Sequence, residues 1–215
     1  MNGKVKEYYY DGNLSFEGEY LNGKRNGKGK EYYYNGKIKF KGEYFNNKKW
    51  AGQGYDQKGN IIYELNNGNG IIKEYNAFDI LLFQGEYLNG VINGKGKEYD
   101  FDGNLIFEGQ YKNRERNGKG KEYYKDGKLK FDGEYLNGYK WNGKGYDKND
   151  NIIFELKNGN GYIKEYFNNG ILKLEGKYIN GELNGTGKEY DSNGKLLYEG
   201  EYLNGLIKEK RKKWK

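Results

Sequence analysis

Residues 16–23 read FEGEYLNG, and residues 27–32, which follow a short polar turn, read GKGKEY. In the first run Phe16, Gly18 and Tyr20 fall on one face of an extended chain, because successive side chains of a β-strand point to opposite sides. An Asn-Gly pair between two runs of this kind favours a tight hairpin turn. The two runs therefore predict a pair of antiparallel strands.

The same pattern recurs along the whole chain. Asn-Gly or Ala-Gly pairs begin at residues 2, 26, 51, 69 and 93, and a shift of 91 residues carries Asn2 onto Asn93 and Trp50 onto Trp141. A fixed period marks a repeat architecture. We therefore expect one continuous array over residues 1–207, made of two duplicated blocks and a terminal unit, at residues 2–92, 93–183 and 184–207.

These units predict an all-β fold: an elongated, twisted, single-layer antiparallel meander of about nine β-hairpin repeats, with about eighteen short strands. Helical periodicity is absent, and 36 glycines disfavour long helices. The two shorter units, around residues 63–65 and 154–156, lack the Gly-Glu-Tyr step and predict shorter strands. For residues 206–215 both a short basic helix and a loose tail fit the sequence.

Glycine recurs two residues apart in the return strands, although glycine weakens a strand by itself. We interpret these Gly-x-Gly steps as sockets for aromatic rings on neighbouring strands, with Phe and Tyr as the plugs. The predicted structural positions are Phe16, Gly18, Tyr20, Gly27, Gly29, Phe40, Gly42, Tyr44, Phe83, Gly85, Tyr87, Gly94, Gly96, Phe107, Gly109, Tyr111, Gly118, Gly120, Phe131, Gly133, Tyr135, Gly176, Tyr178, Gly185, Gly187, Gly200 and Tyr202.

The run Glu17-Gly18-Glu19-Tyr20-x-Asn22-Gly23, followed by Gly27-x-Gly29, resembles the MORN (membrane occupation and recognition nexus) repeat. The longer return strand is similar to the MORN-variant repeats of bacterial antitoxin-like proteins. The resemblance implies a twisted single-layer sheet with a groove, and a role in binding or scaffolding, without identifying the partner. The signature recurs at residues 40–44, 83–87, 107–111, 131–135, 174–178 and 198–202.

The net charge of +7 is unevenly distributed. Residues 208–215 hold six of the 38 basic and one of the 31 acidic side chains, so this tail carries +5 and the rest of the chain only +2. A basic segment with a Trp could bind anionic lipid, contact nucleic acid or act as a nuclear address. It could equally be a solvated terminus that blocks strand pairing at the sheet edge. The candidate binding residues are Lys210, Arg211, Lys212, Lys213 and Trp214 in this tail.

Trp50 and Trp141 occupy equivalent places in the two blocks and are two further candidate binding residues. They could be exposed anchors for a partner. They could also fill the widened units in which they occur.

The sequence has no histidine and no cysteine, which removes the commonest general base, thiol nucleophiles and the usual metal ligands. We expect no catalytic residue, no cofactor and no metal site. The segment 147–151 resembles the start of an EF-hand loop, but Ile152 and Asn158 stand where the loop needs Gly and Glu. The glutamates that recur in every unit read as a periodic solvated face; they include Glu17, Glu19, Glu43, Glu86 and Glu134.

The leading functional hypothesis is a non-enzymatic scaffold for protein–protein interaction, with a partner of unknown identity. Peripheral binding to anionic membranes through the basic tail is a second hypothesis, and antitoxin-like neutralisation of a partner protein is a third. The open sheet ends predict a homodimer, and nucleic acid is not an expected partner of a nearly neutral array. The expected location is the cytoplasm, with membrane or cytoskeleton association as an extension of the binding role.

Overall fold

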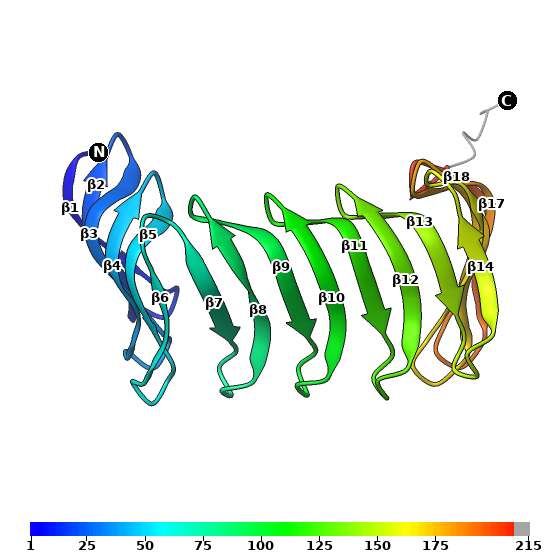
Figure 1. The fold of residues 1–215 in the computed structure, drawn as a ribbon, viewed down its shortest axis with the longest axis horizontal. Helices are drawn as coiled ribbons and strands as arrows, with labels where there is room; N and C mark the ends of the chain where they lie inside the picture. Colours follow the sequence, from blue (N-terminus) through cyan, green and yellow to red (C-terminus); the bar gives the residue numbers. More distant parts are fainter. Residues whose placement is uncertain (209–215) are drawn as a thin grey trace, which may run out of the picture. The chain divides into compact units, whose positions relative to one another are not determined.

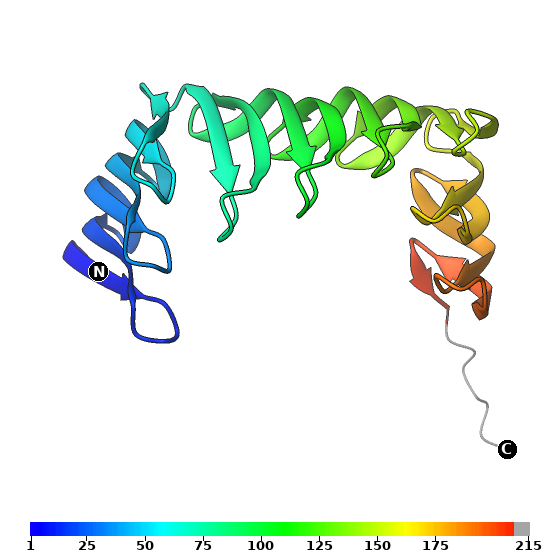
Figure 2. The same ribbon diagram turned by 90° about the horizontal axis from the view of Figure 1, so that it is seen from below.

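The computed structural model describes residues 1–208, and every regular element in that part is a β-strand. Figures 1 and 2 show each strand joined to the next by a short connection. The strands are β1 (Gly3–Tyr8), β2 (Leu14–Leu21), β3 (Lys24–Tyr32), β4 (Ile38–Phe45), β5 (Lys48–Tyr55), β6 (Ile61–Leu65), β7 (Gly70–Tyr75), β8 (Leu81–Leu88), β9 (Val91–Tyr99), β10 (Leu105–Lys112), β11 (Glu115–Tyr123), β12 (Leu129–Leu136), β13 (Tyr139–Tyr146), β14 (Ile152–Leu156), β15 (Gly161–Tyr166), β16 (Leu172–Ile179), β17 (Glu182–Tyr190), β18 (Leu196–Leu203) and β19 (Leu206–Ile207).

The predicted all-β antiparallel meander is confirmed, since consecutive strands pair with each other within each sheet. Neither alternative for residues 206–215 foresaw β19, in which Ile207 pairs with Tyr202 of β18. The remainder of that segment, residues 209–215, lies outside the described part of the chain.

The Asn-Gly pairs form the turns that the sequence predicts. Asn22 and Gly23 connect β2 to β3 with φ values of 52° and 75°. Two successive positive φ values define the turn type whose twist matches that of a hairpin, and Asn and Gly adopt it at low cost. The turn chemistry therefore places Leu21 opposite Lys24 and fixes the register of the pair.

The backbone pairing of the meander is interrupted at two points. The strands form a six-stranded sheet (β1–β6), an eight-stranded sheet (β7–β14) and a five-stranded sheet (β15–β19). Both interruptions fall at the short units, where only the isolated bridges Asn66–Asn69 and Lys157–Asn160 close the hairpins. The strands on either side have five or six residues, because these units lack the Gly-Glu-Tyr step.

The described chain forms two compact units. Unit 1 comprises Met1–Asn104 and Gln110–Arg114, and unit 2 comprises Leu105–Gly109 and the residues from Glu115 onward. In each unit the core lies on one face of the strands, which we call the aromatic face. It contains Phe16, Phe40 and Tyr44 in unit 1, and Phe107, Phe131 and Tyr135 in unit 2; all are at most 3% exposed.

The glycines of the aromatic face lie under aromatic rings. A Cβ added to Gly29 would be 2.7 Å from Cζ of Phe16 and 3.1 Å from Cε2 of Tyr44. The rings of Phe16 and Tyr44 meet edge to face at 5.2 Å, a favourable aromatic arrangement. Unit 2 repeats this geometry around Gly120, with Phe107 in the place of Phe16.

The first glycine of the Gly-x-Gly step has a different role from the second. Gly27 has φ of +98°, and an added Cβ would meet the carboxylate of Glu19 instead of a ring. Its conformation follows a register shift between Gly18 and Tyr20 on the paired strand. Gly27 is therefore required by the backbone of a bulge, whereas Gly29 is required by the packing of Phe16.

Candidate binding face

The opposite side of β1–β6 carries mainly charged side chains, with a few tyrosines such as Tyr55 among them, and we call it the charged face of unit 1. The side chains that alternate with Phe16, Gly18 and Tyr20 in β2 belong to Glu17 and Glu19, as strand geometry requires. A groove of 1210 Å³ runs over this face from β1 to β6, with glycine backbone exposed along it. Its charged and amide side chains come from Lys4, Lys6, Glu17, Glu19, Lys28, Lys30, Lys41, Glu43, Gln53 and Glu64.

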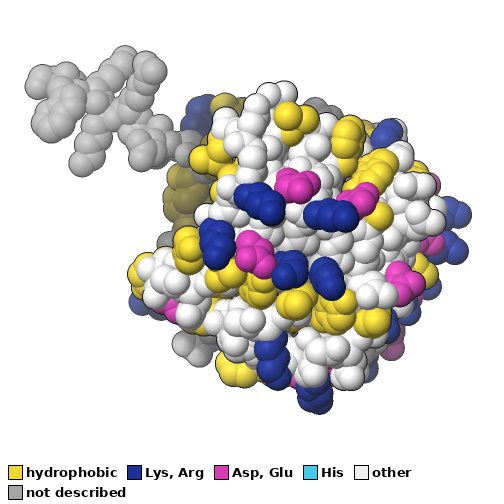
Figure 3. Space-filling model, turned by 90° about the vertical axis from the view of Figure 1, so that its left-hand side faces the viewer, with side chains coloured by type: hydrophobic (Ala, Val, Ile, Leu, Met, Phe, Trp, Pro, Cys, Tyr) yellow, Lys and Arg dark blue, Asp and Glu magenta, His cyan; other side chains and the backbone are white. Residues whose placement is uncertain are grey.

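Strand register arranges these side chains in two rows that cross the strands. Row 1 is Lys6, Glu17, Lys30, Lys41, Gln53 and Glu64, in which each residue pairs directly with the next. Row 2 is Lys4, Glu19, Lys28 and Glu43, in which a bulge joins Glu19 to Lys28 through a 3.0 Å hydrogen bond from the Lys28 backbone amide. Figure 3 shows both rows, with positive and negative side chains interleaved over a floor of backbone.

Several acidic side chains of the charged face are engaged within it. Glu17 accepts hydrogen bonds from the Tyr32 hydroxyl (2.7 Å) and from Nζ of Lys30 (3.1 Å), and these bonds lower the pKa of Glu17. The amide of Gln53 donates to Glu64 at 2.6 Å. The remaining lysines are different: within residues 1–208 no ion pair engages Lys4, Lys6, Lys28 or Lys41.

The aromatic face holds ion pairs that the sequence analysis missed. Arg25 lies 4.0 Å above the ring of Phe16 and 2.6 Å from a carboxylate oxygen of Glu7. In unit 2, Nζ of Lys140 is 2.8 Å from Glu165 and 3.1 Å from Glu122, and all three side chains are less than one-fifth exposed. The sequence did indicate that glutamates lie on the aromatic face. The glutamate of each Lys-Glu-Tyr run, such as Glu31, lies two residues after a glycine that seats a ring, and so it shares the face of that glycine.

These buried pairs fix the charge states of their members. Burial opposes the charged form of Lys140, but the carboxylates of Glu122 and Glu165 outweigh it and raise the pKa of the lysine. Burial alone would raise the pKa of Glu165, yet Lys140, with smaller contributions from Lys130 and Lys173, lowers it to about 2. The cluster is therefore ionised at neutral pH and stabilises the aromatic face.

We expect the low pKa of Glu165 to make unit 2 sensitive to acid. A carboxylate with a depressed pKa stabilises the fold above its unfolded value of 4.5, and this contribution is lost as the pH falls from there towards 2. The loss amounts to about 3 kcal/mol. Urea unfolding at a series of pH values measures it. Glu165→Gln should show a smaller loss of stability between pH 7 and pH 3 than the unaltered chain; equal losses would contradict the assignment.

Trp50 and Trp141 lie at the interrupted hairpins. The ring of Trp50 packs against Phe45, with centroids 5.3 Å apart, and a Cβ added to Gly68 would be 2.8 Å from it. The carbonyl of Trp141 accepts a 2.7 Å hydrogen bond from the amide of Gly159, the equivalent turn of the second block. Both indoles are partly exposed, and this packing favours the interpretation that they fill the irregular units.

The remaining candidates are the segment around Asp147 and the basic tail. Asp147 accepts hydrogen bonds from the backbone amides of Asn149 (2.8 Å) and Asn151 (2.9 Å), so this segment is an ordinary Asx turn. No group of three acidic side chains in residues 1–208 is arranged to hold a metal ion. The same residues contain no helix that is long and apolar enough to cross a membrane. The tail candidates Lys210, Arg211, Lys212, Lys213 and Trp214 lie outside the described residues.

Short antiparallel hairpins that repeat along the chain and seat aromatic rings on glycines define a β-hairpin repeat protein. Family models identify the repeat: residues 16–38 and 83–105 match the MORN repeat, and residues 1–22, 116–137 and 183–204 match the MORN repeat variant. The chain is a MORN-repeat protein.

Comparison with individual proteins adds little. No curated protein matches the sequence. Among solved structures, virginiamycin B lyase from Staphylococcus aureus is 12% identical over 93% of this chain and 70% of its own, with a TM-score of 0.24. The TcdB2-TccC3-TEV structure is 11% identical over 88% of this chain and 12% of its own, with a TM-score of 0.13. Neither similarity bears on fold or function at these scores.

Proposed function

We propose that this protein is a non-catalytic scaffold that binds a protein partner along the charged face of its MORN repeats. The observation that carries the proposal is the groove over β1–β6, in which two rows of charged side chains repeat at the spacing of the strands. Repetition offers a partner many similar contacts and singles out no group for chemistry. The lack of histidine and cysteine in the sequence supports a binding role without catalysis.

Strand spacing explains how such a face can recognise a partner. Neighbouring strands lie about 4.8 Å apart, so the rows present one charged or amide group at each such step. Individual exposed ion pairs contribute about 0.2–1 kcal/mol each, and a useful affinity therefore needs several of them together. A segment that lies along the rows makes these contacts simultaneously, whereas a small molecule does not.

Site-specific photocrosslinking in the native cell tests this function. A photoreactive residue in place of Gln53, inside the groove, should capture a discrete protein. The same residue in place of Asn35, in an exposed turn outside the groove, is the matched control and should capture much less. Crosslinks of equal yield from both positions, or crosslinks from position 53 to lipid alone, would contradict a protein-binding groove.

A further inference from the structure

Three lysines lie together in the middle of the charged face. Lys30 and Lys41 are direct cross-strand partners on β3 and β4. Lys28 is two residues before Lys30 and therefore on the same face. We call Lys28, Lys30 and Lys41 the lysine cluster. Like charges that face each other across a strand pair are unfavourable, because their side chains are only about 5 Å apart at Cβ.

The ion pairs of the charged face leave this repulsion largely in place. Lys30 is bound to Glu17 at 3.1 Å, with 40% of its side chain exposed. Lys28 and Lys41 are exposed, and neither forms an ion pair within residues 1–208. Both extend over the groove, where a bound carboxylate could reach them. Lys28 and Lys41 thus offer two cations that no carboxylate of the described chain pairs with.

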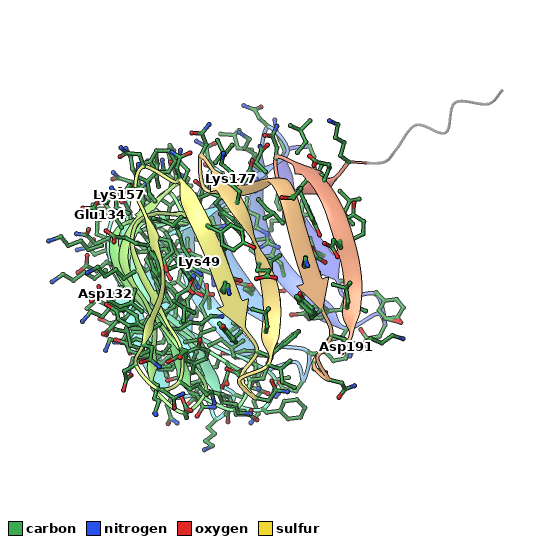
Figure 4. All side chains as sticks on the ribbon, turned by 90° about the vertical axis from the view of Figure 1, so that its right-hand side faces the viewer. Lys49, Asp132, Glu134, Lys157, Lys177 and Asp191 are labelled. Carbon is green, nitrogen blue, oxygen red and sulfur yellow. The ribbon has the colours of Figure 1, made fainter. Side chains whose placement is uncertain are left out.

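The duplicated block shows that the fold does not require this arrangement. The residues 91 positions after Lys30, Lys41 and Gln53 are Lys121, Asp132 and Lys144, which alternate in sign across β11, β12 and β13. Nζ of Lys121 is 3.7 Å from Oδ2 of Asp132. Figure 4 shows Asp132 and Glu134 directed away from the strands on the side of unit 2 that corresponds to the charged face. Unit 2 is therefore neutralised at this position and unit 1 is not.

We propose that the lysine cluster of unit 1 binds an acidic segment of the protein partner, with its carboxylates placed on Lys28, Lys30 and Lys41. This assignment rests on the proposed function and names its site and the chemistry of the partner. A protein segment fits better than a membrane, because Glu17, Glu43 and Glu64 line the same groove. A segment can place its own side chains between these glutamates, whereas a continuous layer of anionic headgroups would be repelled by them.

Titration of the full chain with a short oligo-glutamate peptide, followed by NMR, tests the assignment. The backbone amides of β3 and β4 should respond at a peptide concentration about tenfold lower than those of β11 and β12, which corresponds to about 1.4 kcal/mol. The second block is thus an internal control for fold. The preference should weaken as salt is added, because the contacts are exposed ion pairs.

Exchange of single charges sharpens the test. Lys41→Asp introduces the residue of the second block and should abolish the preference for β3 and β4. Asp132→Lys should create a similar response at β11 and β12. Lys37→Asp makes the same charge change in an exposed turn outside the groove and should leave the preference intact. Unchanged thermal unfolding would show that each variant is folded.

Several outcomes would overturn the assignment: equal responses in the two blocks, a preference that survives Lys41→Asp, or the same shifts of β3 and β4 with phosphatidylserine vesicles. The scaffold role is judged separately. If the protein crosslinked through position 53 also binds the Lys41→Asp variant with unchanged affinity, the lysine cluster is not its site, but the scaffold function stands.

Discussion

Gly42→Ala should destabilise unit 1 by about 3 kcal/mol or more, because the added methyl group has no space and its neighbours cannot move. The new Cβ would run into the carbonyl oxygen of Ala51 and lie 2.8 Å from Cα of Gly52. Both atoms belong to the backbone of β5, so β4 and β5 would have to separate. Urea unfolding measures the loss of stability.

Gly29→Ala is the matched comparison, since its added Cβ meets the ring of Phe16 first. This substitution should cost about 1–3 kcal/mol. A second substitution, Phe16→Leu, should recover part of that cost by making room, and the double-mutant cycle should show favourable coupling. The corresponding Phe40→Leu should not rescue Gly42→Ala, because the three nearest contacts at Gly42 are all to backbone. Rescue of both variants, or of neither, would refute this distinction.

Lys140→Met should destabilise unit 2 by about 3–5 kcal/mol, because it leaves the carboxylates of Glu122 and Glu165 without their shared buried cation. Neutralising those carboxylates as well, as Gln, should restore much of the lost stability. Lys157→Met is the control: that lysine is 82% exposed and 3.8 Å from Glu155, and its loss should change stability by less than about 0.5 kcal/mol. Thermal and urea unfolding of the three variants make the comparison. Similar losses for Lys140→Met and Lys157→Met would show that the buried cluster is energetically unimportant.

The fold was largely predictable because every unit repeats the same strand and turn signals in its sequence. Alternation around Phe16 indicates a strand, the Asn22-Gly23 pair specifies the hairpin, and repetition removes most ambiguity in topology. The sequence predicted only part of the interruption at residues 66–69. The missing Gly-Glu-Tyr step predicts shorter strands, but how few backbone hydrogen bonds survive there depends on the three-dimensional path of the strands.

The candidate site was harder to predict from the sequence. Glu17 and Glu19 were recognised as members of a periodic face, but the groove depends on which residues of six strands come side by side. Bulges shift that register, as between Gly18 and Tyr20, and a bulge is not evident from alternation alone. The direct cross-strand pairing of Lys30 with Lys41 is therefore evident only from the structure. The buried role of Lys140 was missed because charged residues were assumed to face solvent.

The two bridges that close the short hairpins also bear on how the array comes apart. In a linear repeat protein each unit is stabilised by its immediate neighbours, so loss of structure spreads from one unit to the next as far as their coupling permits. At residues 66–69 and 157–160 the pairing of adjacent strands is reduced to one isolated bridge each, although contacts such as Lys140–Glu165 still cross the second of these points. Fraying that starts at either end should pause at these points, and a pulling force should release the ribbon in separate steps instead of all at once.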